Sequence, residues 1–250
     1  MSAEGVEVCG FASDGDTRLL KCMTYNMVTA SFDAKWPWFR ANRSIPFVCI
    51  QDAIHIGNKL KNRFLSPSII LPFGNMLVAS SGHLVELIER HQLKGQHLLC
   101  ISDLNSKDKM NHAAMLRMCD KKVTELLQVK VKFSEATAMY LDMTRDVVEA
   151  LTSVSLSPLE RLEKMWRWVF FLRIWRDNIL KSPGYTLESN FITRNAYLCV
   201  ELNAHALIVI ITKFRDSENH NLFLPWLMSS QPCEATFRDL RSRESSFSIL

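Results

Sequence analysis

The first part of the chain alternates apolar runs with polar turns, as expected of a small α/β unit. The stretch VEVCGFASDGD, residues 6–16, reads as a strand that ends in an acidic turn, and residues 17–27 follow as a short helix. A second apolar run, residues 47–50, shows no alternation of apolar and polar positions. Such a run is typical of a strand that is buried on both faces. The pattern therefore predicts two short strands with a helix between them.

An acidic residue follows each predicted strand. The first strand ends at Asp14 or Asp16, and the second ends at Asp52. From there a helical period places one polar stripe beside an apolar one, and the polar stripe consists of Asp52, His55, Lys59 and Arg63. In open α/β sheets ligands bind beyond the carboxyl ends of the strands, which makes this stripe a candidate binding surface. The alternative is an ordinary amphipathic helix with a solvated charged face.

The pattern becomes helical from about residue 65 to residue 222. Apolar residues recur at helical spacing in the segments 82–93, 109–128 and 134–153. The clearest helix start is Ser157-Pro158-Leu159-Glu160, where the serine and the glutamate form a capping box. We expect this part to be almost wholly helical. Its predicted core is built around Trp166, Phe170, Leu202 and Ile208.

The helix after the capping box carries tryptophan and phenylalanine residues among basic ones. Residues 159–181 contain six basic and three acidic side chains. Aromatic rings interleaved with arginine can stack on nucleic-acid bases. The alternative is a core helix whose basic side chains extend along its surface to water. A second long apolar helix is predicted within residues 191–214, and it too is expected to be buried.

The chain ends with a helix that bears one acid near its start. Pro232 is expected to begin this helix, with Glu234 in the first turn, where the helix dipole favours a carboxylate. Helical spacing puts Glu234 on one face with Phe237, Arg238 and Arg241.

Composition narrows the class of protein. The chain has 250 residues, 48% of them hydrophobic, a net charge of +4 and no low-complexity tract, which predicts a globular protein. Seven cysteines without a CxxC pair, and an N-terminus without signal-peptide character, indicate a reduced intracellular protein without a cysteine-based zinc site. The longest apolar run, residues 206–211, is too short to cross a membrane.

Taken in order, these features resemble P element-type DNA transposases and, more distantly, hAT transposases. The resemblance consists of a strand that ends in Asp-Gly, a strand followed by D-x-x-H-x-x-x-K-x-x-x-R, a long helical segment and a helix with E-x-x-F-x-x-x-R. The resemblance covers nearly the whole chain. No single motif is specific, so it depends on the order and spacing of the motifs. It implies a mostly α fold with a small α/β part. An incomplete ribonuclease-H-like core, residues 1–64, would be interrupted by an all-helical insertion, residues 65–222, and completed by residues 223–250.

The resemblance also implies catalytic roles. Asp14 matches the second acid of the family's catalytic triad and Glu234 the third. Both are therefore expected to ligate Mg²⁺ or Mn²⁺, with carboxylates within roughly 10 Å of each other, for DNA cleavage and strand transfer. Asp52 and His55 match a supporting pair that follows the second acid. They either help at the metal site or hydrogen-bond to each other and order the start of their helix.

DNA is the partner that the resemblance implies. The residues expected to contact its phosphates are Lys59, Arg63 and Arg241. The family also binds GTP through the insertion, and the matching region here is 108–111. That region lacks a phosphate-cradling glycine loop, so GTP is a weakly supported cofactor. A homo-oligomer and a nuclear location are further expectations.

The chain departs from the family pattern at two acids. Only thirteen residues precede Asp14, which leaves no room for the strand that carries the first triad acid, and Glu4 and Glu7 follow no recognisable strand. Gln231 stands where the family has an aspartate. Two hypotheses follow: a partial transposase chain that is inactive alone, or a non-catalytic transposase-derived scaffold that binds DNA or protein. The missing first acid favours the second for this polypeptide, which we expect to bind DNA weakly without cleaving it.

Overall fold

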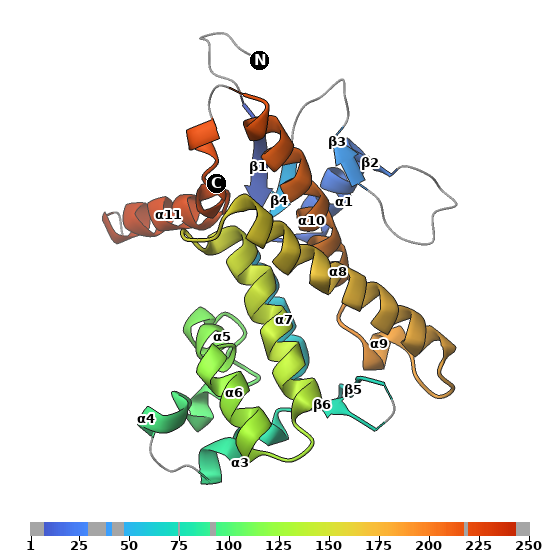
Figure 1. The fold of residues 1–250 in the computed structure, drawn as a ribbon. Coiled ribbons are helices and arrows are strands. Elements are labelled where there is room, and N and C mark those ends of the chain that lie inside the picture. The colour runs from blue at the N-terminus through green and yellow to red at the C-terminus, as the bar shows by residue number, and fades with distance from the viewer. Residues whose placement is uncertain are drawn as a thin grey trace.

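The structure, a computed structural model, describes residues 8–29, 39–41, 48–74, 76–90, 94–217 and 220–243. It is mostly helical with a small sheet part (Figure 1). The strands are β1 (Gly10–Ser13), β2 (Met27–Thr29), β3 (Phe39–Ala41), β4 (Val48–Gln51), β5 (Leu71–Pro72) and β6 (Val78–Ala79). The α-helices are α1 (Thr17–Asn26), α2 (Ala53–Phe64), α3 (Gly82–Arg90), α4 (Lys94–His97), α5 (His112–Met118), α6 (Lys121–Lys130), α7 (Glu135–Thr152), α8 (Pro158–Lys181), α9 (Leu187–Asn190), α10 (Arg194–Arg215) and α11 (Gln231–Arg243).

Strands β1 and β4 form a parallel pair, with Gly10 opposite Val48 and Ser13 opposite Gln51. All four side chains of β4 are buried, as its unbroken apolar run predicted. Helix α1 and the antiparallel pair β2–β3 lie between the two strands in the sequence. Because the strands are parallel, their carboxyl ends meet at one edge of the sheet, and both predicted polar turns begin there. Phe47, predicted as the start of the second strand, lies outside the described residues.

Helix α10 packs against β4 and closes one side of this sheet (Figure 1). Asn203 of α10 pairs with the backbone of Gln51: its Oδ1 accepts the Gln51 N–H at 2.7 Å and its Nδ2 donates to the Gln51 carbonyl at 2.8 Å. One amide side chain thus replaces a neighbouring strand at the end of β4. The unpaired backbone groups of a buried strand end would otherwise be costly.

A bidentate ion pair joins α10 to α8 inside the core. The fully buried Glu201 accepts from Arg173 at 2.8 and 2.7 Å, and also from the hydroxyl of Tyr197 at 2.7 Å. By length and composition α10 could cross a membrane, but 61% of its most apolar window is buried inside the protein. It is the buried core helix that the sequence predicted.

Helix α8 begins at the predicted capping box. Ser157 Oγ accepts the N–H of Glu160 at 3.3 Å, and the Glu160 carboxylate accepts the N–H of Ser157 at 2.7 Å. The aromatic residues of α8 mainly serve the core: Trp168 and Trp175 are buried, and the Trp175 indole donates to the carbonyl of Pro72 at 2.7 Å. These two rings therefore do not offer a face to nucleic-acid bases.

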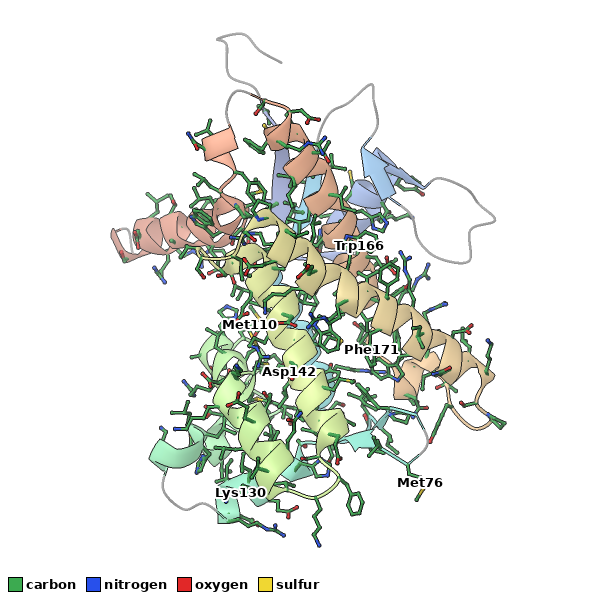
Figure 2. The ribbon with its side chains drawn as sticks, in the orientation of Figure 1. Met76, Met110, Lys130, Asp142, Trp166 and Phe171 are labelled. Carbon is green, nitrogen blue, oxygen red and sulfur yellow. The ribbon has the colours of Figure 1, made fainter. Side chains whose placement is uncertain are left out.

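The predicted core is only half correct. Leu202 is fully buried and Trp166 is partly buried against the core, but Phe170 is 54% exposed and Ile208 is 39% exposed. Figure 2 shows Trp166 and Phe171 along α8, where Phe171 packs at a centroid distance of 6.0 Å from Trp175. Both α8 and α10 carry apolar residues around much of their circumference, so periodicity did not identify the buried face.

The segment 65–222 is not wholly helical, contrary to the prediction. It contains the short antiparallel pair β5–β6, with Leu71 opposite Ala79 and Pro72 opposite Val78. The turn between them includes Gly74 at φ 70°, a left-handed conformation that glycine adopts without strain. Pro72 also lacks the N–H that a helix would need. The sequence around Pro72 and Gly74 thus breaks the helical pattern locally.

One continuous hydrophobic core connects the described parts of the chain, from Leu20 of α1 to Ile210 of α10. Helix α7 packs against α2, α6 and α8, and α10 packs against both α8 and the sheet. The division into units at residues 64 and 222 stays a prediction. The core fixes the position of α2, because α2 packs against both α7 and α10. Helix α2 carries several of the candidate site residues.

Candidate functional site

The candidate site lies where β1 and β4 end. Asp14 and Asp52 follow the paired residues Ser13 and Gln51, and the N–H of Asp52 donates to the Ser13 carbonyl at 2.7 Å. The two acids have different surroundings: Asp14 is exposed, whereas Asp52 is 1% exposed. Asp14 Oδ1 accepts the N–H of Asp16 at 3.1 Å and so shapes its own turn.

Asp52 is the N-cap of α2. Its Oδ1 accepts the N–H groups of Ile54 and His55 at 2.8 and 3.3 Å. Its Oδ2 accepts from the Ser229 hydroxyl at 2.5 Å and from the N–H and hydroxyl of Ser230 at 2.9 and 3.0 Å. Burial works to raise the pKa of Asp52, but the hydrogen bonds from Ser229 and Ser230 outweigh it and lower that pKa.

Helix α11 returns to this edge of the sheet through Glu234. His55 Nε2 lies 3.0 Å from Glu234 Oε1, which also accepts the Ser230 hydroxyl at 2.9 Å. The His55 side chain is largely buried, while that of Glu234 is 46% exposed. Asp52 and Glu234 are thus linked through Ser230 and His55. Asp14 takes part in no hydrogen bond or ion pair with Asp52, His55 or Glu234 in the described structure.

The sequence did not single out two polar residues that complete this cluster, Asn58 and His112. The His112 ring packs edge-on to that of His55 at 5.9 Å, and its Nδ1 contacts the side-chain amide of the buried Asn58. Burial and the neighbouring His55 lower the pKa of His112. A signal for Asn58 existed, because it lies on α2 one turn beyond His55. His112 comes from a distant helix, and no sequence pattern indicated it.

Lys59, a predicted DNA contact, holds the Asp14 turn against α10. Its Nζ donates to the Gly15 carbonyl at 2.7 Å and to Asn195 Oδ1 at 2.6 Å. Gly15 has φ 85°, and a Cβ there would lie 2.3 Å from Lys59 Nζ, so glycine is required for this approach. Lys59 therefore carries a positive charge to the loop that bears Asp14.

A hollow of about 680 Å³ opens beside this loop. Its basic side chains are Lys59, Arg63 and Lys109, and Asp16 is its one acid. We call it the basic hollow. The Arg63 guanidinium is held in place by two backbone carbonyls. Its Nε donates to the Phe191 carbonyl at 2.7 Å, and the guanidinium also contacts the Glu188 carbonyl. Arg241, the third predicted DNA contact, is exposed near the end of α11 and lies outside this hollow.

In the region matched to GTP binding, residues 108–111, most polar groups hydrogen-bond within the protein. Asn111 caps α5 and donates to Asp108 Oδ2 at 2.8 Å. Lys61 donates to the Asp108 carbonyl at 2.8 Å, which ties this loop to α2. Lys109 alone turns toward the basic hollow. GTP binding stays a prediction.

The carboxylates at the sheet edge are engaged by protein donors rather than arranged around a common point. Within the described ranges, no group of three or more His, Cys, Asp or Glu side chains is placed to hold a metal ion. Two-metal chemistry needs such a group at one phosphate. The residues as they stand do not fit a two-metal site, and we assign no step to a metal. That Asp14 and Glu234 share a metal ion stays a prediction.

Of the comparisons with known proteins, only that with solved structures gives a match, and it concerns the fold. No family model matches the sequence, and no curated protein matches it. Among solved structures, the chain is similar to a Drosophila P element transposase strand transfer complex, with a TM-score of 0.74 and 14% sequence identity. The similarity covers 96% of this chain and 56% of that one. The chain thus has a transposase-like fold and spans little more than half the length of its structural neighbour.

Proposed function

We propose that this protein is a P element transposase-like protein that binds DNA at the carboxyl edge of the β1–β4 sheet. The observation that carries the proposal is the return of residues 229–234 to the start of α2, directly after β4. Ser229, Ser230 and Glu234 contact Asp52 and His55 from the far end of the sequence. This closure is what a ribonuclease-H-like core split by a helical insertion requires, and the fold similarity over 96% of the chain supports it.

The charge of the basic hollow supports DNA as the ligand. Lys59, Arg63 and Lys109 face one hollow with a single acid, Asp16, among its lining residues. Cations grouped in this way neutralise phosphates and release counterions, which is the main source of affinity in sequence-independent DNA binding. Asn195 and Gly15 hold the Lys59 side chain in place. Binding of DNA would therefore cost little additional side-chain entropy at Lys59.

Binding of duplex DNA tests this proposal. The Lys59→Gln/Lys109→Gln variant should bind a labelled duplex about tenfold more weakly at low salt, and its log–log salt slope should be shallower by about 1.8. The control is Lys121→Gln/Lys132→Gln, which removes the same charge from exposed positions outside the hollow. Equal losses in the two variants would show that binding depends on net charge alone, and absence of binding by the unaltered protein would overturn the proposal.

We do not expect the chain to cut DNA by itself. The Glu234 carboxylate contacts His55 and Ser230, and Asp14 makes no hydrogen bond or ion pair with it in the described structure. Two metal ions need several carboxylates around one phosphate, and Asp14 and Glu234 are the only candidate metal ligands that the sequence resemblance supplies. Of the two hypotheses, the DNA-binding scaffold therefore accounts better for the contacts at this edge.

A further inference from the structure

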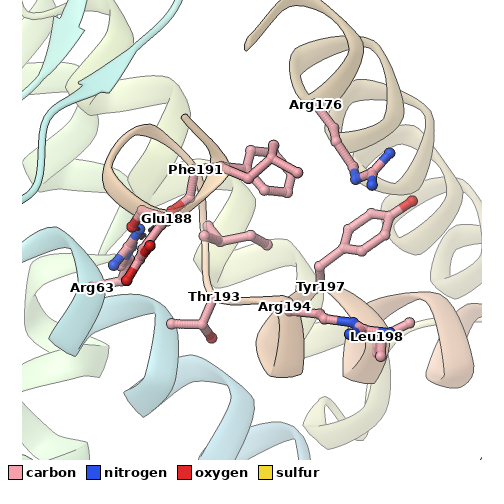
Figure 3. A pocket seen from close by; sticks show the side chains of 10 residues that line it. Arg63, Arg176, Glu188, Phe191, Thr193, Arg194, Tyr197 and Leu198 are labelled. Atoms are coloured by element: carbon pink, nitrogen blue, oxygen red, sulfur yellow. Dashed lines mark hydrogen bonds between the residues drawn. The ribbon is translucent and has the colours of Figure 1, made fainter. Parts of the chain in front are cut away.

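A second hollow, of about 620 Å³, lies between α8, α9 and the beginning of α10. We call it the arginine hollow. Three arginines line it, Arg63, Arg176 and Arg194, and Figure 3 shows them around the ring of Phe191. Leu187 and Leu198 are its partly exposed apolar residues, whereas Phe191, Ile192 and Tyr197 are buried beneath it. The hollow therefore combines cations with an apolar surface, unlike an ordinary solvated face.

The positive charge of the arginine hollow is poorly balanced. Glu188 is the one acid among its lining residues and is exposed. The Arg176 guanidinium lies over the ring of Tyr197 at 5.9 Å, and Figure 3 shows the two side chains turned toward each other. Within the described structure Arg176 and Arg194 enter no ion pair with a carboxylate. An anion entering the hollow would therefore meet two arginines, Arg176 and Arg194, that pair with no carboxylate in the described structure, whereas Arg63 already donates to the carbonyls of Phe191 and Glu188.

The arginine hollow adjoins the basic hollow, because Arg63 and Thr193 line both. Cations therefore follow one another across the surface, from Lys109 and Lys59 through Arg63 to Arg194 and Arg176. A small anion would use one of these hollows. A chain of phosphates can use both, so the continuity favours an extended polyanion.

We propose that the two hollows form one groove for a single DNA strand, with phosphates at the arginines and an unpaired base against the apolar lining of the arginine hollow. This inference rests on the proposed DNA-binding function and specifies the form of DNA. A duplex keeps its bases stacked inside and offers phosphates to a surface, so it has no use for a concave apolar lining. A single strand exposes its bases, and one of them can lie against Leu187 and Leu198, the partly exposed apolar residues of the arginine hollow.

Fluorescence anisotropy with three ligands tests the groove: labelled oligothymidine, a labelled duplex of equal length, and unlabelled thymidine monophosphate as competitor. The variant is Arg176→Gln/Arg194→Gln. Its matched control, Arg167→Gln/Arg215→Gln, removes the same charge from exposed positions on the same two helices, outside both hollows. Melting temperatures of both variants should stay close to that of the unaltered protein.

The groove variant should bind oligothymidine at least about tenfold more weakly, with a salt slope shallower by about 1.4, and should bind the duplex nearly as well as the control does. Equal effects in variant and control, or an equal loss for duplex and single strand, would overturn the inference. So would competition by thymidine monophosphate at concentrations comparable to the oligonucleotide, which would indicate a small-anion site. Binding of duplex but not of single strand would refute the groove and leave the proposed function standing, whereas no DNA binding at all would refute both.

Discussion

At the scale of single residues, Asp52 connects the two ends of the chain. It caps α2 with one carboxylate oxygen and receives Ser229 and Ser230 with the other. The sequence allowed two roles for Asp52, metal support or ordering of the helix start; the structure shows that Asp52 caps α2, and a metal role stays a prediction. Its predicted partner was His55, but the donors are mainly two serines that precede α11. No spacing rule could have found a contact between residues so far apart in sequence.

Asp52→Ala should lower the free energy of unfolding by about 3 kcal/mol, because it removes a cap and leaves buried donors without an acceptor. Asp120→Ala is the matched control: Asp120 caps α6 through the N–H of Lys122 and has no distant partner. That control should cost only about 1 kcal/mol. Urea titration of both variants gives the two values, and equal costs would mean that the serine contacts contribute nothing.

Protonation of the half-buried His112 and of the buried His205 should make the protein sensitive to mild acid. Burial is the main cause that lowers the pKa of His112 and of His205 in the folded state. Below about pH 6.5 the unfolded chain therefore binds protons that the folded chain resists, so stability falls as pH decreases. The melting temperature should drop between pH 7.5 and pH 5.5, and it should drop less in His112→Gln. An identical drop in both proteins would contradict this role for His112.

At the scale of elements, α8 and α10 are fixed to each other by Arg173 and Glu201. Sequence patterns predicted both helices and the capping box of α8, because those signals are local. They did not predict which faces are buried, since that depends on how the two helices pack. Phe170 was expected inside and is exposed, while the charged Glu201 is fully buried with a partner on the other helix.

Arg173→Met should destabilise the protein by about 3–5 kcal/mol, because it leaves the buried carboxylate of Glu201 without its partner. The double variant Arg173→Met/Glu201→Leu should recover much of that loss. Lys181→Met serves as control, since its ion pair with Asp177 is on the surface and should contribute less than about 1 kcal/mol. Chemical denaturation of these variants and of Glu201→Leu alone measures the coupling, and additive effects of the two core substitutions would contradict it.

At the scale of the whole molecule, the order of motifs predicted more than any single motif. A strand with Asp14, a strand with Asp52, a helical middle and a helix with Glu234 together indicated a transposase-like fold, and the structural similarity agrees with it. The small β5–β6 pair was missed, because its strands have two residues each and lack a pattern of their own. The arginine hollow was missed because it depends on how α8, α9 and α10 pack and on Arg63 from the distant α2, neither of which a sequence pattern shows.

The central proposal is that this chain binds DNA through its basic surface and does not cut DNA by itself. Incubation of the protein with supercoiled plasmid and Mn²⁺, followed by gel electrophoresis before and after removal of the protein, tests both parts at once. We predict retarded plasmid at low salt, loss of that retardation at higher salt, and supercoiled plasmid alone once the protein is removed. Nicked circles that form with the unaltered protein and disappear with Glu234→Ala would contradict the account.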